Sequence, residues 1–202
     1  MNWKKLFLGI IVCIAAQKTY AQETDSIQKK YFIGSTFFML ANLLPEPPDY
    51  YQLNLGYRFN AANVITFEAI TWNYKGPLGR QYGIHYENPE FDFPGKVIAF
   101  GAGLTYKRFL WRKTYAQVHS TLLRQHYLDL EGIRIQSGYQ LFNTLRFGYQ
   151  FCFWKDRLFF EPSIAFTFWP VNTNLPDSFQ AQEDKFPKYF IGEPGLHFGI
   201  NF

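Results

Sequence analysis

Residues 188–202 read Lys-Tyr-Phe-Ile-Gly-Glu-Pro-Gly-Leu-His-Phe-Gly-Ile-Asn-Phe, and this stretch decides the fold. Its apolar side chains share one face of an extended chain: Phe190, Leu196, Phe198, Ile200 and Phe202. Its polar side chains share the other face: Glu193, His197 and Asn201. Because successive side chains of a strand point to opposite faces of its sheet, the pattern predicts a strand with one apolar and one polar face.

Three further segments, 50–59, 137–151 and 158–170, show the same alternation. In 137–151 the apolar set includes Phe147, and the opposite face is polar: Gln140, Thr144, Arg146 and Gln150. A wall that separates lipid from a polar interior requires this pattern. The sequence therefore favours strands that face an apolar medium on one side only.

Two segments, 31–40 and 64–74, alternate less clearly. A shift of one residue in their register would exchange their two faces. Pro162 and Pro194 lack the amide donor that a strand paired on both sides requires. We expect bulges close to these two prolines.

The connections between the predicted strands alternate in length. The eight strands cover about 31–40, 50–59, 64–74, 96–108, 114–127, 137–151, 158–170 and 188–202. Short turns join them at 60–63, 109–113 and 152–157, and longer segments join them at 41–49, 75–95, 128–136 and 171–187. Short periplasmic turns and long extracellular loops are typical of outer-membrane proteins. The fold class predicted is all-β: an eight-stranded antiparallel up-and-down transmembrane β-barrel, with both chain ends on the periplasmic side.

The first 21 residues have the three parts of a secretory signal. Lys4 and Lys5 form a basic start, residues 6–16 are apolar, and Thr19-Tyr20-Ala21 offers a cleavage site. The apolar run is too short for a permanent membrane helix, which needs roughly 20 such residues. We expect a cleaved signal peptide at 1–21, a flexible periplasmic tail at 22–30 and a barrel domain at 31–202.

Aromatic residues make up 21% of the chain, with 23 Phe and 14 Tyr, while the mean hydropathy is only −0.20. Many rings fall near the ends of predicted strands, where a barrel contacts lipid headgroups. One expected girdle lies near the turns: Tyr57, Phe59, Trp111, Phe151, Phe153 and Trp154. The other lies near the loops: Tyr50, Tyr51, Trp72, Tyr74 and Trp169. The alternative is that these rings form the core of a soluble β-sandwich.

Charge and cysteine content exclude two classes of protein. Removal of Lys4, Lys5 and Lys18 with the leader leaves 17 of the 20 basic residues, against 16 acidic ones. The remaining basic residues are scattered singly, so nucleic-acid binding is not expected. Cys152 is the one cysteine after the leader, so the fold must form without an internal disulfide.

Residues 195–202, which alternate and end on Phe202, resemble the C-terminal signature of the small eight-stranded outer-membrane β-barrel proteins of Gram-negative bacteria. The resemblance covers about residues 31–202. It implies that Phe198, Ile200 and Phe202 form the signal that the barrel assembly machinery recognises during insertion. It also implies location in the cell outer membrane, with outer-membrane lipid and lipopolysaccharide as partners.

The inward face of the predicted barrel carries a balanced set of ionisable residues: Arg58, Glu68, Lys107, His119, Arg146, Glu161, Glu193 and His197. Side chains fill the interior of an eight-stranded barrel. A buried charge without a partner costs several kcal/mol. We therefore expect these residues to form a paired polar network that closes the lumen, and a narrow pore is the alternative.

No catalytic residue, cofactor site or metal site is assigned. The strongest enzyme alternative is a lipid A deacylase-like protein of the barrel wall, based on His119-Ser120-Thr121 and Glu131. His119 and Ser120 are neighbours on a strand and point to opposite faces, so they cannot form a nucleophile–base pair. Acids in the second long loop, Glu87, Glu90 and Asp92, lack the spacing of a calcium loop.

The long loops are the remaining place for a binding function, because exposed segments on a rigid scaffold often carry one. The 75–95 loop is rich in rings: Tyr82, His85, Tyr86, Phe91 and Phe93. We therefore expect a non-enzymatic integral outer-membrane protein that supports envelope structure or binds a ligand through its loops. The ligand itself is not predicted.

Overall fold

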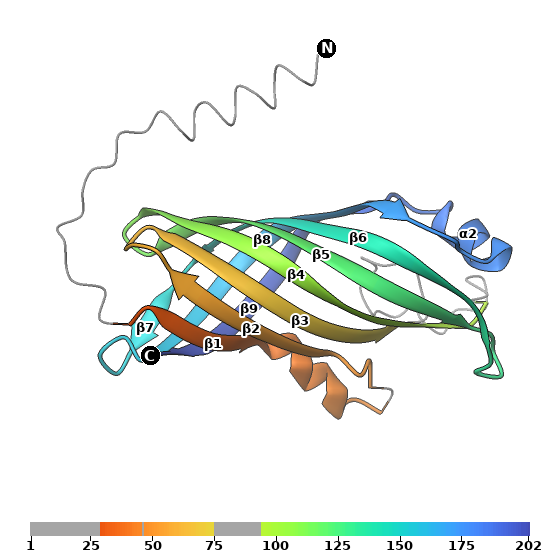
Figure 1. Ribbon diagram of the computed structural model, residues 1–202, viewed down its shortest axis with the longest axis horizontal. Helices are drawn as coiled ribbons and strands as arrows, with labels where there is room; N and C mark the ends of the chain where they lie inside the picture. Colours follow the sequence, from red (N-terminus) through yellow and green to blue (C-terminus); the bar gives the residue numbers. More distant parts are fainter. Residues whose placement is uncertain (1–28, 46, 75–93) are drawn as a thin grey trace, which may run out of the picture.

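The computed structural model describes residues 29–45, 47–74 and 94–202 and shows one antiparallel sheet whose strands close into a ring (Figure 1). The predicted signal peptide, almost all of the predicted tail and most of the 75–95 loop lie outside the described residues. The strands are β1 (Tyr31–Thr36), β2 (Tyr51–Arg58), β3 (Asn63–Tyr74), β4 (Lys96–Trp111), β5 (Thr114–Leu128), β6 (Arg134–Tyr149), β7 (Phe151–Phe153), β8 (Leu158–Asn172) and β9 (Tyr189–Asn201). The predicted all-β class and antiparallel pairing are confirmed.

The strands are ordered β6-β5-β4-β3-β2-β1-β9-β8-β7 in the sheet. An additional pairing of β6, at one end of this order, with β8, near the other end, closes the ring. β6 and β7 are successive parts of one path along β8, since Gly148 pairs with Ser163 and Phe151 with Phe160 in the same register. The interruption between them lies opposite Pro162, which has no N–H to donate. Pro162 therefore interrupts the ladder without shifting its register, whereas we expected a bulge there.

A bulge does occur in β9 near Pro194. Ala165 pairs with Glu193, but the next residue, Phe166, pairs with Ile191, so Gly192 is the extra residue. Gly192 has a φ of 84°, a conformation that glycine adopts without steric cost. Side chains alternate between the two faces of a strand, so one extra residue reverses the alternation. Residues of β9 that precede Gly192 therefore point to the opposite face from the one that the sequence pattern predicts. Phe190 therefore lines the interior. The prediction that it lies on the outer face is wrong.

Two elements near the long loops were not predicted. β1 ends at Thr36 instead of continuing to about residue 40, and a 3-10 helix η1 (Phe37–Leu43) follows it. The Thr36 hydroxyl accepts a hydrogen bond from the Phe38 amide and so caps this helix. A second short helix, α2 (Asp177–Glu183), lies in the connection between β8 and β9, at the long-loop end of the ring (Figure 1).

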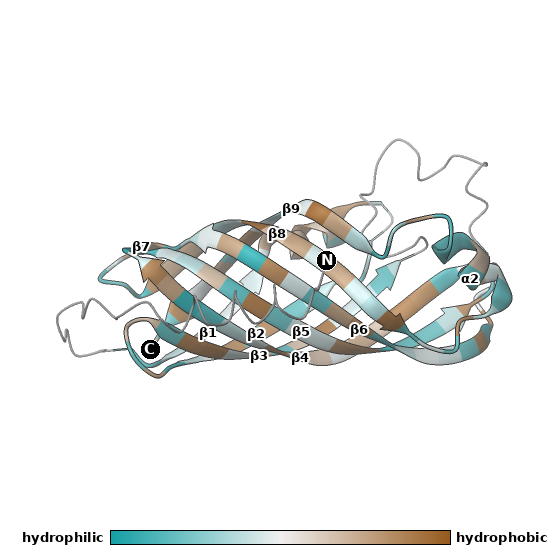
Figure 2. Ribbon diagram, turned by 90° about the horizontal axis from the view of Figure 1, so that it is seen from above, coloured by the Kyte–Doolittle hydropathy of each residue, from teal (hydrophilic) through white to brown (hydrophobic). Residues whose placement is uncertain are grey.

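Burial alternates along the strands with the polar side chains inside. In β3, Val64, Thr66 and Glu68 are buried, while Ile65 and Phe67 between them are exposed. Hydropathy alternates visibly along the strands in Figure 2. The register of β1 and β3, left open by the sequence, is therefore settled with Phe32 and Glu68 facing inward.

Apolar clusters occupy both ends of the ring interior. At the turn end, Phe32, Val64 and Phe159 are buried together, and the rings of Phe32 and Phe159 meet edge to face at 5.3 Å. At the loop end, α2 contributes Phe179 to a second cluster: Tyr74, Val97, Ala99, Leu123, Tyr127, Trp169 and Phe179. Interior side chains are therefore arranged in three layers, with the polar layer between two apolar ones.

The second cluster changes the interpretation of the loop-end rings. Tyr50, Tyr74 and Trp169, expected in an outer girdle, are 9%, 7% and 2% exposed and lie inside. Tyr51 is 55% exposed and faces outward. Among the residues that the structure covers, no helix has the length and apolar character needed to cross a membrane.

Candidate functional site

The polar layer contains three separate groups of ionisable side chains. Glu68, which is 2% exposed, is the centre of the first. Its carboxylate accepts hydrogen bonds from Gln52 Nε2 at 2.6 Å and Thr121 Oγ1 at 2.8 Å, and it lies 3.0 Å from His119 Nε2. β2, β3 and β5 supply these residues. The carboxylate thus has three partners that replace lost water.

Lys107 and Glu161 form the second group. The Lys107 ammonium lies 2.6 Å from both carboxylate oxygens of Glu161, and Gln150 Nε2 donates to one of them at 2.7 Å. The ammonium also lies 4.5 Å from the centroid of the Tyr115 ring, a distance at which the ring face attracts a cation. Each charge in this buried pair therefore has its opposite charge in contact.

Arg146 and Glu193 form the third group. Arg146 donates to Ser163 Oγ at 3.0 Å and to Glu193 Oε1 at 3.3 Å. The Thr167 hydroxyl donates to the other oxygen of Glu193. Gly195 leaves the space that Arg146 occupies, because a Cβ there would lie 1.7 Å from the guanidinium.

The remaining two residues of the predicted network differ from the rest. Arg58 lies at the turn end, where it donates to Asn201 Oδ1 at 3.0 Å and lies over the rings of Phe32 and Phe109. Within the described residues, the His197 ring makes no hydrogen bond, and it borders the cavity described below. The structure thus brings six of the eight residues into pairs and leaves Arg58 and His197 outside them.

Residues near the loop end extend the first group. Asn42 and Tyr50 exchange two hydrogen bonds, of 2.8 and 2.9 Å, and Tyr50 Oη donates to Gln52 Oε1 at 2.6 Å. Burial, and then the negative charges of Glu68 and Glu193, raise the pKa of Tyr50 well above its ordinary value. Its hydroxyl therefore remains a donor, and a chain of contacts runs from η1 to Glu68. The inward parity of Gln52 was visible in the sequence, but its partner was not.

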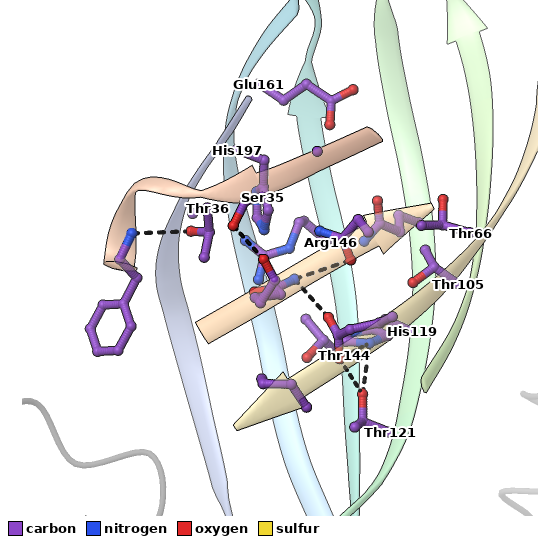
Figure 3. A pocket seen from close by; sticks show the side chains of 18 of the residues that line it. Ser35, Thr36, Thr66, Thr105, His119, Thr121, Thr144, Arg146, Glu161 and His197 are labelled. Atoms are coloured by element: carbon purple, nitrogen blue, oxygen red, sulfur yellow. Dashed lines mark hydrogen bonds and ion pairs between the residues drawn. The ribbon is translucent and has the colours of Figure 1, made fainter. Parts of the chain in front are cut away.

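A cavity of about 410 Å³ lies beside these groups (Figure 3). Along its wall runs a row of inward residues that are Cα partners across five strands: Thr66, Thr105, His119, Thr144 and Thr167. We call this set the threonine row. Sequence reasoning missed it, because each threonine belongs to a different strand.

The enzyme alternative finds no support in this geometry. His119 Nε2 lies 2.7 Å from Thr121 Oγ1 and 3.0 Å from Glu68 Oε1, so the hydroxyl and the acid share one ring nitrogen. A relay needs the acid on one nitrogen and the nucleophile on the other. Ser120 bonds instead to Asn143 at 2.8 Å, and Glu131 is exposed in a turn.

The expected assembly residues Phe198, Ile200 and Phe202 face outward and are 40%, 50% and 62% exposed. In the described ranges, no group of three or more His, Cys, Asp or Glu side chains is arranged to hold a metal ion. Comparison with known proteins finds no matching family model, no matching curated protein and no matching solved structure.

Proposed function

We propose that this chain is an integral outer-membrane β-barrel protein with a closed lumen, which supports the envelope or presents its loops to a ligand. The observation that carries the proposal is the inverted distribution of side chains. Leu104, Val118 and Phe147 face outward and are 55–61% exposed. Glu68, Glu161 and Arg146 face inward and are 2–7% exposed. Large exposed apolar surfaces mark contact with lipid or with another protein.

The apolar outer surface continues from strand to strand around the ring. Each long strand has exposed apolar residues: Phe67 on β3, Leu104 on β4, Leu122 on β5, Leu145 on β6, Ile164 on β8 and Ile200 on β9. A soluble partner would cover one side of such a ring, whereas lipid surrounds all of it. Lipid is therefore the medium that fits this surface.

Strand length supports the same location. Six strands, from the 12 residues of β3 to the 16 residues of β4 and β6, exceed the roughly 9 to 11 residues that a tilted strand needs to cross a bilayer. Rings at the turn end also face outward, with Trp111 and Trp154 68% and 76% exposed. Indole rings are stabilised at the headgroup level.

A closed lumen is supported by the two apolar clusters and by the paired charges between them. Ion conduction requires a continuous wet path, and Phe32 with Phe159 occupies the turn end of the interior. Lys107 and Glu161 neutralise each other in their ion pair, so neither charge is free to attract a passing ion. These contacts favour a structural or loop-presenting role over a pore.

The proposal is tested by heat-modifiable migration of the chain from purified outer membranes. We expect the unboiled protein to migrate differently from the boiled protein, because a closed sheet of this type resists detergent at room temperature. Extraction of the membranes with carbonate distinguishes integral from peripheral association. A chain that is released by carbonate and migrates identically in both samples would overturn the proposal.

A further inference from the structure

The wall of the ring is incomplete on one side near the loop end. β1 pairs with β2 only from Tyr31 to Gly34 and with β9 only from Phe32 to Thr36. Among the described residues, no strand therefore lies between Tyr51–Leu53 of β2 and residues 189–196 of β9. The apolar helix η1 leaves the ring at this gap, and its Phe37 ring packs 4.8 Å from that of Phe198 on the outer face.

The cavity reaches this gap. Most of its lining faces inward, but the lining also includes Ser35 and Phe198, which have the outward parity of β1 and β9. Phe38, Tyr50 and Phe190 add rings to this region of the lining. An apolar mouth thus connects the interior with the surface that we assign to lipid.

The inner part of the cavity is polar and contains groups without partners. The hydroxyls of Thr66 and Thr105 border the cavity and bond to no other described residue. At the mouth, beside the rings of Phe38 and Tyr50, the indole Nε1 of Trp72 is also buried without a partner in the described part of the chain. A buried unsatisfied donor costs about 1–3 kcal/mol, so an occupant with an acceptor would be stabilised here.

The charges in the lining disfavour an anion. Two cations, Lys107 and Arg146, stand against three carboxylates, those of Glu68, Glu161 and Glu193. Each of these groups already has a partner inside the ring. A carboxylate head would therefore add an unpaired charge to a low-dielectric interior.

We propose that this cavity binds one uncharged single-chain amphiphile, with its hydroxyl or carbonyl head at Thr66 and Thr105 and its hydrocarbon chain in the apolar mouth. The inference rests on the proposed membrane location, since the mouth opens to the outer face. The volume of about 410 Å³ lies in the range of roughly 300–1,000 Å³ that is typical of small-ligand sites.

Quenching of tryptophan fluorescence by 10-bromodecan-1-ol tests the proposal. The background carries Trp111→Phe and Trp154→Phe, which removes two exposed outer reporters and keeps Trp72 at the cavity. We expect saturable quenching of the folded protein in detergent. Thr105→Phe fills the cavity and should weaken the apparent affinity about tenfold or more, because it removes both volume and a hydroxyl.

The matched control is Val118→Phe, which adds a ring on the outer face of β5, where Val118 is 55% exposed. It should leave quenching unchanged. The milder Thr66→Leu replaces Thr105→Phe if the latter does not fold. Equal quenching of the Thr105→Phe variant and of the protein with an unfilled cavity would overturn the proposal. Tighter binding of 10-bromodecanoate than of 10-bromodecan-1-ol would overturn the assignment of an uncharged ligand.

Heat-modifiable migration and carbonate extraction of the same preparations separate this inference from the proposed function. A protein that is integral to the membrane but shows no cavity-dependent quenching would refute only the binding site. A soluble protein that retains cavity-dependent quenching would refute the membrane location and the lipid-facing mouth.

Discussion

The ammonium group of Lys107 lies 2.6 Å from both carboxylate oxygens of Glu161, across the ring interior from β4 to β8. Both side chains are almost fully removed from solvent, with exposed fractions of 6% and 4%. Neither charge is tolerated there alone, because the desolvation of the two charges is offset mainly by their mutual contact, with the hydrogen bond from Gln150 and the Tyr115 ring beside the ammonium adding to it. The two side chains meet only when β4 and β8 have the correct register, so this pair stabilises the fold only in that register.

Replacement of one partner of this pair should be costly. Glu161→Gln leaves the Lys107 ammonium buried without a counter-charge, and we expect a loss of about 3–5 kcal/mol in the free energy of unfolding. Lys107→Met with Glu161→Leu should recover much of the loss, since no charge remains buried. Urea titration of the folded protein in detergent measures these values.

The control for this pair is Lys113→Met, which breaks the exposed contact of Lys113 with Asp156 at 3.9 Å. Exposed ion pairs contribute little, and we expect a change of less than about 1 kcal/mol. A small effect of Glu161→Gln, similar to that of the control, would mean that the interior pair does not form.

The position of a residue along β4 should decide the cost of an outward cation. Leu104, at the middle of β4, and Leu110, near its turn end, face outward and are 61% and 52% exposed. In the proposed membrane, Leu104→Arg should cost about 2–4 kcal/mol and Leu110→Arg about 0–1 kcal/mol, because the penalty for an outward cation falls from the midplane to the interface. Folded yield by heat-modifiable migration reports the difference, and equal yields would contradict a membrane around this surface.

The bulge in β9 should require a residue that tolerates its backbone conformation. A Cβ at Gly192 would meet no atom within 4 Å, but φ there is 84°. Gly192→Ala should therefore destabilise the fold by about 1–2 kcal/mol through backbone strain alone. Gly192→Asn should cost less, since asparagine visits positive φ more readily. Thermal unfolding of the two variants makes the comparison, and identical stabilities would argue against the bulge.

The closed interior should prevent conduction. We expect no steady single-channel current when the purified protein is reconstituted in planar bilayers, because apolar clusters at Phe32 and Trp169 block both ends. A truncated pair, Phe32→Ala with Phe159→Ala, opens only the turn end and should also stay silent. Regular ohmic steps from the unmodified protein would restore the pore alternative.

The faces of most strands could be predicted from the sequence because alternation is a local property. The outward positions of Leu55, Phe147 and Ile200, and the inward positions of Gln52 and Thr144, follow from a period of two within one strand. The same reasoning failed for Phe190, because one extra residue at Gly192 reverses the parity. Gly195 and Gly199 lie in the same strand, and nothing in the sequence distinguished Gly192 from them as the bulge.

The site was less predictable than the fold. Inward parity identified His119, Lys107 and Glu161 as interior residues, but the inward position of Glu68 depended on the register of β3, which the structure settled. Parity did not indicate which of these residues pair. Lys107 and Glu161 are 54 residues apart in the sequence and come from strands that are not neighbours in the ring. The threonine row likewise exists only because register aligns one residue from each of five strands.

The sequence by itself determined that the chain is an antiparallel all-β protein with polar and apolar faces, since a two-residue period is encoded within each strand. The tertiary structure alone decided that β6 meets β8, that Lys107 meets Glu161, and that the early end of β1 leaves a gap beside a cavity. These outcomes depend on the register and stagger of strands that are distant in sequence. No local pattern of residues specifies them, because they are set only when the whole ring closes.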